Sequence, residues 1–270
     1  MEITYLNEEG ERISKNCDLE FGKEPHASNG EMDLLSADET LLEKGYHIFS
    51  LRKMDTLLDL ERIITAQIVQ RLSIYQQVPK DFELSNYHNC LTRLDNHFRV
   101  STWALDYEVL GSAFFDIKHQ MEDLLKFKLA VKKIKHNGVD GEYVGFRILR
   151  PLKNDHNPFH RDAWIPYWRD TVNIWLPLCG FENANTLQMI PGSHNWADSQ
   201  ILKTKAGVEI DGKTYHVPAA IGTVNDFTID TPDLIKGEGL VFSPFLIHGN
   251  GVNRKPNTTR VSLEFRFCRQ

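Results

Sequence analysis

The hydrophobic pattern of this chain changes its period near residue 142, and the change divides the sequence into two halves of different character. Before that point, apolar residues recur in steps of three and four, as on one buried face of a helix. The clearest stripe consists of Leu57, Leu60, Ile64, Ile68 and Leu72. From Val144 onward, apolar residues alternate with others, as in strands. Helices followed by strands predict an α+β domain whose strands form a sandwich or an open barrel.

Local signals place the expected elements. Ser36 and Glu39 have capping-box spacing, which predicts a short helix that ends near Gly45. Other elements expected in the first half are a strand at 47–51, a helix at 56–77 capped by Asp55, and helical segments at 81–97 and 112–135. Strands expected in the second half lie at 142–149, 171–178, 186–190, 222–229, 239–248 and 259–267.

The charged and titratable residues of the helical half are expected at the surface. The pattern at 112–135 carries a lysine run that is typical of a solvated helix face: Lys126, Lys128, Lys132, Lys133 and Lys135. Three histidines in helical patterns are also expected at the surface: His97, His119 and His136.

Composition and charge favour a cytoplasmic globular protein. The 270 residues include 41% hydrophobic and 25% charged residues, with a net charge of −6. This balance argues against a nucleic acid or an anionic membrane as partner. The sequence has no apolar run of membrane-spanning length and no signal-peptide pattern at its start. The four cysteines show no CxxC spacing, which favours reduced thiols: Cys17, Cys90, Cys179 and Cys268.

Two segments of different packing are expected. Residues 1–36 are polar and predict a loosely packed arm with one short hairpin. Residues 37–270 predict a single domain, with helices mainly at 37–136 and the strand-rich core mainly at 142–268.

A histidine and an aspartate at the start of the second half form a candidate metal site. His160 and Asp162 stand two residues apart, so an extended backbone would place both side chains on one face. His248 is the best third ligand, because it ends an apolar strand pattern and precedes glycines that allow close approach. Two histidines and a carboxylate form the facial triad of non-haem Fe(II) oxygenases, which leaves three positions of the iron open.

A candidate carboxylate receptor follows the third ligand. Arg260 comes twelve residues after His248, and Ser262 shares its face if this segment is a strand. A guanidinium group with a hydroxyl beside it suits a carboxylate. Iron beside such a receptor is what a 2-oxoacid cosubstrate requires, since the acid chelates the metal at one end.

These motifs resemble the phytanoyl-CoA dioxygenase family of Fe(II)/2-oxoglutarate-dependent oxygenases. The resemblance is carried by the HxD pair, NTLQMIPGSH at 185–194 and HGNGVNRKPNTTRVSLEFRF at 248–267. GYHIF at 45–49 is similar to the family's opening strand, so the resemblance runs from about residue 38 to the C-terminus. One departure is Asn185, where family members often have glycine.

The resemblance implies a fold, cofactors and residue roles. It implies a double-stranded β-helix (jelly-roll) core with flanking helices, and Fe(II), 2-oxoglutarate and O2 as cofactor and cosubstrates. It implies that the iron ligands are His160, Asp162 and His248. The cosubstrate would contact Arg260 at its C5 carboxylate, Ser262 as a second anchor and Trp175 at its border. Because the carboxylate ligand is present, hydroxylation of a small molecule with release of succinate and CO2 is expected rather than halogenation.

Residues on the substrate side are predicted with competing interpretations. Trp164, Tyr167, Trp168 and Arg169 follow the HxD pair and would line a substrate mouth or pack on the sheet edge. Arg147 would face the barrel interior or solvent. His194 is expected to be a turn residue, and Asp155 and His156 are expected in a loop.

Other functions stay open at this point. A jelly-roll protein can bind a ligand without catalysis, and a cupin-like metalloenzyme can work without 2-oxoglutarate. The tripeptide at 160–162 is also the HRD of protein kinases, but Tyr167 stands where a kinase needs asparagine, so that interpretation fails. The substrate is not predicted beyond a small molecule.

Overall fold

An eight-stranded antiparallel sheet forms the centre of the computed structural model. The structure describes residues 2–6, 12–16, 19–22, 38–90, 94–101, 104–136, 139–153, 155, 157–182, 185–210 and 213–270. The main path of this sheet runs through β4 (Tyr46–Ser50), β13 (Glu238–Phe242), β9 (Thr171–Cys179), β15 (Arg260–Arg269), β8 (Val139–Leu149) and β5 (Ala104–Asp106). Two short strands extend it, with β6 (Leu129–Val131) beside β15 and β7 (Lys133–His136) beside β8.

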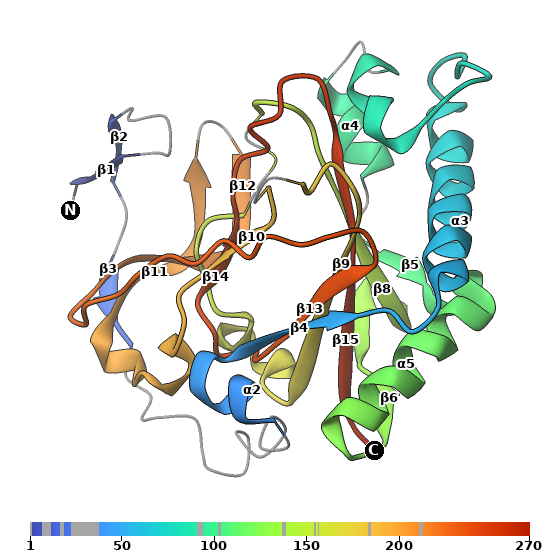
Figure 1. Ribbon diagram of the computed structural model, residues 1–270. Helices are drawn as coiled ribbons and strands as arrows, with labels where there is room; N and C mark the ends of the chain where they lie inside the picture. Colours follow the sequence, from blue (N-terminus) through green and yellow to red (C-terminus); the bar gives the residue numbers. More distant parts are fainter. Residues whose placement is uncertain are drawn as a thin grey trace.

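Smaller sheets lie on the far side of the central sheet from the two long helices, α3 (Met54–Leu72) and α5 (Gly111–Leu125) (Figure 1). They pair β10 (Leu187–Met189) with β14 (His248–Asn250), and β12 (Lys213–Thr223) with β11 (Ile201–Ile210), which also pairs with β3 (Leu19–Phe21). The expected N-terminal hairpin is present as β1 (Glu2–Leu6) and β2 (Arg12–Asn16).

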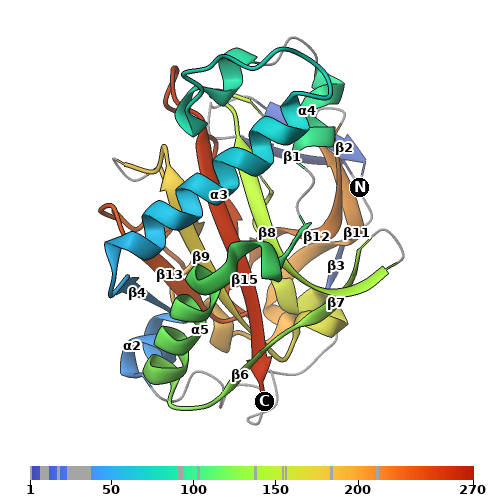
Figure 2. The same cartoon turned by 90° about the vertical axis from the view of Figure 1, so that its right-hand side faces the viewer.

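Two long helices cover the outer face of the central sheet. Figure 2 shows α3 (Met54–Leu72) and α5 (Gly111–Leu125) crossing β8, β9 and β15. The apolar stripe of α3 is fully buried, as its spacing predicted. On β15 the odd-numbered residues from Val261 to Phe267 pack into the same core. Burial of each such side chain contributes about 1.5–3 kcal/mol.

Apolar and polar residues alternate strictly along β15, so the face of the sheet away from the helices carries polar groups. Its even-numbered residues carry polar or charged groups and point to the opposite, inner face of the sheet: Arg260, Ser262, Glu264 and Arg266. The helix-covered face therefore supplies stability, and the inner face is free to hold a polar site.

The helical half differs from expectation at several boundaries. The short helix α2 (Glu39–Lys44) ends at Gly45 as predicted, but its N-cap is Asp38, whose carboxylate accepts the Leu41 N–H at 3.0 Å. Ser36 lies outside the described residues. The predicted cap of α3 is wrong, because Asp55 lies inside its first turn and the N-cap residue has no side-chain hydrogen bond. The helix also ends at Leu72 rather than at 77.

The helical segments predicted at 81–97 and 112–135 are longer than the helices in the structure. Residues 81–97 contain a 3₁₀ helix, η2 (Leu84–Cys90), and the start of α4 (Leu94–Val100). The lysine run does not lie on a helix, because α5 ends before it and the chain continues as β6 and β7. Lys126 is the left-handed C-cap of α5, with φ of 62°.

His97 is buried, not at the surface. Its ring contacts the Tyr87 hydroxyl at 3.1 Å and lies 3.5 Å from the carboxylate of Asp155, which pairs with Arg150. Asp155 is in a loop as expected, and its buried carboxylate ties this loop to α4. His119 is exposed as expected, while the His136 side chain and His156 lie outside the described parts.

The strands of the second half are confirmed except in two places. Residues 239–248 do not form one strand, because β13 ends at Phe242 and a turn containing Pro244 leads to β14. Residues 222–229 are not a strand either, since β12 ends at Thr223 and a loop follows. In the described part of the chain, no helix has the length and apolarity needed to span a bilayer.

Candidate metal centre

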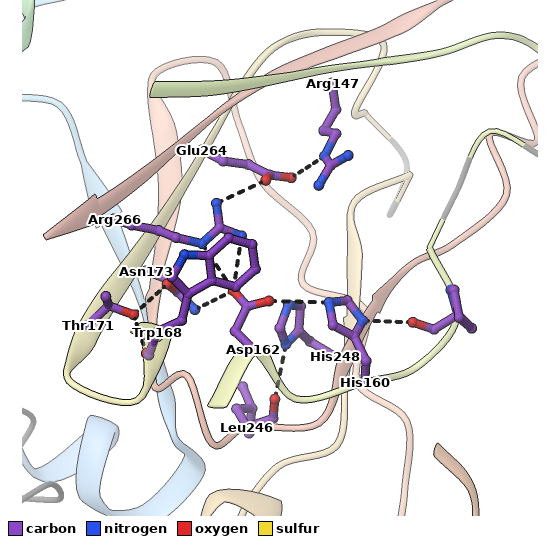
Figure 3. A network of polar contacts seen from close by, with 11 residues as sticks. Arg147, His160, Asp162, Trp168, Thr171, Asn173, Leu246, His248, Glu264 and Arg266 are labelled. Atoms are coloured by element: carbon purple, nitrogen blue, oxygen red, sulfur yellow. Dashed lines mark hydrogen bonds and ion pairs between the residues drawn. The ribbon is translucent and has the colours of Figure 1, made fainter. Parts of the chain in front are cut away.

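The three predicted metal ligands converge on one point at the inner side of the central sheet. The ligand atoms of His160, Asp162 and His248 all lie within 4.8 Å of one another, and the three residues are buried. The two histidines pair across an antiparallel bridge, with backbone hydrogen bonds of 2.9 and 3.0 Å. Arg161 between the first two ligands has an extended backbone, so both side chains point the same way (Figure 3).

Backbone carbonyls fix both imidazole rings. The Nδ1 of His160 lies 2.8 Å from the carbonyl oxygen of Pro158, and the Nδ1 of His248 lies 3.0 Å from that of Leu246. A carbonyl only accepts hydrogen bonds, so each Nδ1 carries the proton and each Nε2 keeps a lone pair. The Nε2 of His160 lies 3.3 Å from the Oδ1 of Asp162. This orientation is the one that metal-binding histidines adopt.

The protonation states of Asp162 and His248 suit a divalent metal. Burial alone raises the pKa of Asp162, but the neighbouring positive charge of Arg266 outweighs it, so this pKa lies well below its usual range. Burial and the neighbouring His160 ring lower the pKa of His248 to about 4. A carboxylate and neutral imidazoles are the forms that bind metal.

Arg161 ties the metal-binding pair to the PGSH turn. This buried side chain donates to the Asp198 carboxylate at 2.6 Å, to the carbonyl of Trp196 at 3.0 Å and to that of Ser193. Ser193 in turn accepts the Ile247 N–H at 2.8 Å, one residue before the third ligand. The sequence analysis missed Arg161, although the PGSH motif was a signal that this turn supports the site.

A small cavity of about 20 Å³ opens beside the three proposed ligands. One wall is apolar and includes Trp175, Leu187 and Phe242. Another part of the wall is charged, and there Glu264 accepts from Arg147 at 3.0 Å and from Arg266 at 3.4 Å (Figure 3). Arg147 therefore faces the interior, which is one of its two predicted orientations.

Three polar residues of this cavity were missed by sequence reasoning. Glu264 and Arg266 follow Arg260 and Ser262 on the same face of β15, so continued alternation was an available signal. Asn173 donates to the Oδ2 of Asp162 at 3.0 Å from β9, a contact that depends on strand pairing.

Of the predicted cosubstrate residues, Trp175 lines the cavity, whereas Arg260 and Ser262 lie nearer the start of β15. Arg260 donates to the backbone carbonyls of Asn185 (2.8 Å), Thr186 (2.9 Å) and Gly251 (3.0 Å), and it does not line the cavity. Two donors nearby are buried without a hydrogen-bond partner among the described residues: the Oγ of Ser262 and the Nε1 of Trp175.

The residues that follow the HxD pair do not border the cavity directly. Trp168 is buried and its ring lies 4.1 Å from the Arg266 guanidinium. The indole of Trp164 donates to Asp198 at 3.1 Å, and Arg169 lies over the Phe245 ring. Tyr167 is 51% exposed. Trp168 therefore contacts Arg266, which supports Asp162, and does not line the cavity.

Comparison with known sequences decides the family. A family model described as phytanoyl-CoA dioxygenase (PhyH) matches residues 76–261, more than two thirds of the chain. The chain belongs to this family. The match spans the three converging ligands and Arg260 and stops one residue before Ser262. As a PhyH-family protein, the chain is a non-haem Fe(II)/2-oxoglutarate-dependent oxygenase.

Solved structures share the fold at low sequence identity. EctD from S. alaskensis, crystallised with 2-oxoglutarate and 5-hydroxyectoine, is 13% identical, with a TM-score of 0.51 over 94% of this chain and 85% of that chain. This likeness confirms the predicted double-stranded β-helix core. AviO1 from Streptomyces viridochromogenes Tue57 is 15% identical over 88% of this chain and 95% of its own, with a TM-score of 0.48. No curated protein sequence matches the chain.

Proposed function

We propose that this PhyH-family oxygenase hydroxylates a small molecule at an iron held by His160, Asp162 and His248. The observation that carries the proposal is the convergence of three buried ligand atoms within 4.8 Å, with both imidazole Nδ1 atoms held by carbonyls. Two neutral imidazoles and one carboxylate suit Fe(II) and leave three positions open. When bound, iron with 2-oxoglutarate and O2 supplies the oxidising chemistry, and the chain positions the reactants and excludes water.

The cosubstrate is proposed to place its distal carboxylate at the end of β15. Ser262 and Trp175 each offer a buried donor that lacks a partner among the described residues, and such donors are costly unless a ligand satisfies them. Arg260 lies on the same face two residues earlier and adds positive charge. Its bonds to three carbonyls also hold the turn at 185–186 against Gly251, so it shapes this end of the barrel.

The substrate is proposed to enter beside the charged wall of the cavity. The Nε of Arg147 donates a hydrogen bond to Glu264. Its terminal nitrogens make no hydrogen bond within the described residues. They suit an anionic or strongly polar substrate group. The carboxylate of Asp162 fills the position that a halogenase leaves to chloride, which supports hydroxylation.

The first test is spectroscopic and catalytic. Anaerobic Fe(II) with 2-oxoglutarate should give a weak visible charge-transfer band, and aerobic turnover should release succinate. Asp162→Ala should abolish both signals because it removes one of three ligands. The matched control is Asp170→Asn, on the same segment but exposed and paired with Lys132, which should behave as wild type. Unchanged succinate production by Asp162→Ala would contradict the proposal.

A second test addresses the cosubstrate. Ser262→Ala and Trp175→Phe each remove one donor and keep most of the side-chain volume. Each should raise the KM for 2-oxoglutarate by about tenfold, since one hydrogen bond to a charged group contributes about 1.5–3 kcal/mol. Fe(II) affinity should stay as in the wild type. If neither variant changes the KM, the distal carboxylate binds elsewhere. If the wild-type enzyme does not consume 2-oxoglutarate, the alternative of a cupin-like metalloenzyme that works without it would be favoured.

A further inference from the structure

Arg266 reaches the metal site from the inner face of β15. Its side chain is 11% exposed, and its Nη2 and Nε donate to the Oδ2 of Asp162 at 3.0 and 3.3 Å. Its Nη1 donates to Glu264 at 3.4 Å, and its guanidinium stacks 4.1 Å from the Trp168 ring. Figure 3 shows the guanidinium held between these groups. The side chain is thus fixed on three sides.

The two oxygens of Asp162 have different surroundings as a result. Oδ2 accepts hydrogen bonds from Arg266 and from the Asn173 amide at 3.0 Å. Oδ1 faces the Nε2 of His160 at 3.3 Å, on the side of the metal ligands. A carboxylate oxygen that already accepts several N–H groups is a poor metal ligand, so only Oδ1 is available to the metal.

The charges of the network balance without further groups. Arg147, Glu264, Arg266 and Asp162 alternate in sign along one chain of contacts. Glu264 holds the guanidinium of Arg266 in the plane that directs its other edge at Asp162, and Arg147 compensates the second carboxylate. A planar guanidinium fork can serve both carboxylates at once, whereas a lysine ammonium is a single point charge.

We propose that Arg266 is a positioning residue that holds Asp162 as a one-oxygen metal ligand and so keeps a coordination position open. The inference rests on the proposed function, because it requires the metal at these three ligands. If Asp162 could rotate, its second oxygen would occupy a position that the 2-oxoacid or O2 needs. Arg266 would therefore act through Asp162, which it contacts directly.

The test compares Arg266→Met, Arg266→Lys and Asn173→Ala with the wild type. Arg269→Lys is the matched control, because Arg269 is an exposed arginine on the same strand with no contact to Asp162. Each protein is titrated anaerobically with Fe(II), then with 2-oxoglutarate at saturating metal. Fe(II) affinity and the charge-transfer band are recorded separately, since loss of a group that supports a ligand costs about 10–100-fold in metal affinity or activity.

The expected result is a change in the band at saturating metal. Arg266→Met should bind Fe(II) but give a shifted or roughly tenfold weaker band, because two-oxygen ligation competes with the oxoacid. Arg266→Lys and Asn173→Ala should give smaller changes, and Arg269→Lys none. If Arg266→Met does not fold, Arg266→Lys and Asn173→Ala decide the question.

Two results would be negative in different ways. Bands identical to wild type in these variants, with only weaker Fe(II) binding, would show that Arg266 is merely structural and overturn the inference alone. A wild-type protein without any band and without succinate release would overturn the proposed function, and the inference with it.

Discussion

At the scale of single residues, Gly45 shows how closely the end of α2 packs against His194 and Leu246. It ends α2 in the left-handed region with φ of 82°, and its N–H bonds to Leu41 at 2.9 Å. A Cβ atom here would lie 2.5 Å from the Nδ1 of His194 and 2.9 Å from Leu246. The carbonyl of Leu246 holds the His248 ring, so the space around Gly45 is linked to a proposed metal ligand.

Gly45→Ala should therefore lower the free energy of unfolding by about 2–5 kcal/mol. The left-handed backbone costs about 1–2 kcal/mol for alanine, and overpacking adds about 1–3 kcal/mol. Gly192→Ala is the control, because Gly192 has a similar φ of 76° and no atom closer than 3.8 Å to its Cβ position. It should show the backbone cost alone. Urea denaturation measures both, and equal losses would show that the contact with His194 can relax.

The placement of residues was predictable where a short motif sets the spacing. His160 and Asp162 share a face because one extended residue separates them, and this follows from sequence alone. The contact of Arg266 with Asp162 spans 104 residues and depends on how β9 and β15 pair. No spacing rule gives that register, so the residues that support the metal ligands became visible only in the structure.

At the scale of elements, the end of α5 shows why the lysine run was misread. Glu122 in the last turn accepts from Lys118 at 2.6 Å, from Lys128 at 3.0 Å and from the Leu129 N–H at 3.0 Å. These contacts turn the chain from the helix into β6. Lysines suit a solvated helix and a solvated strand edge equally well, so charge alone did not locate the end of the helix.

The Glu122 cluster predicts a pH dependence of stability. Burial raises the pKa of Glu122, but the Leu129 N–H and both lysines outweigh it and lower the pKa to about 2. A lowered folded-state pKa stabilises the protein above the unfolded value near 4.5, and this contribution is lost as the pH falls toward 2. Glu122→Gln should therefore cost on the order of 2 kcal/mol at pH 7 and nothing near pH 2.

Denaturation at several pH values checks this expectation. The control is Asp123→Asn, because the neighbouring Asp123 pairs with Arg52 at a site where both side chains are 59% exposed. An exposed pair contributes less than about 1 kcal/mol. A cost of Glu122→Gln that stays constant from pH 7 to pH 2 would contradict the assigned role.

Element prediction failed where apolar residues run without a break. In 239–248 the apolar pattern continues through Pro244, yet the chain turns there and only its ends are strands. The turn matters for function, since it aims His248 back toward His160. Alternation predicted β8, β9 and β15 well because each has one face on the helix-covered core.

At the scale of the whole molecule, the metal site joins segments that are distant in sequence. Two ligands come from the loop before β9 and the third from β14, which belongs to a separate two-stranded sheet. The pairing of β10 with β14 was not predictable, because no local pattern specifies which distant strands meet. The pairing of β11 with β12 was missed, although the sequence Asp-Gly between them is a hairpin signal. A bound metal would hold these layers together, whereas the unfolded chain offers no such site.

This arrangement predicts that metal and 2-oxoglutarate together raise the thermal stability. At a ligand concentration of about 100 times Kd, binding to the folded state alone adds about 2.7 kcal/mol. For a chain of this size that corresponds to roughly 5–10 °C in Tm.

Co(II), which does not turn over, should give part of the shift alone and the full shift with 2-oxoglutarate, while 2-oxoglutarate alone should give little. Asp162→Ala should lose both shifts while Asp170→Asn keeps them. If 2-oxoglutarate alone stabilised the protein as much as the pair, the oxoacid would bind without the metal, and the coupling of the two layers through one ion would be refuted.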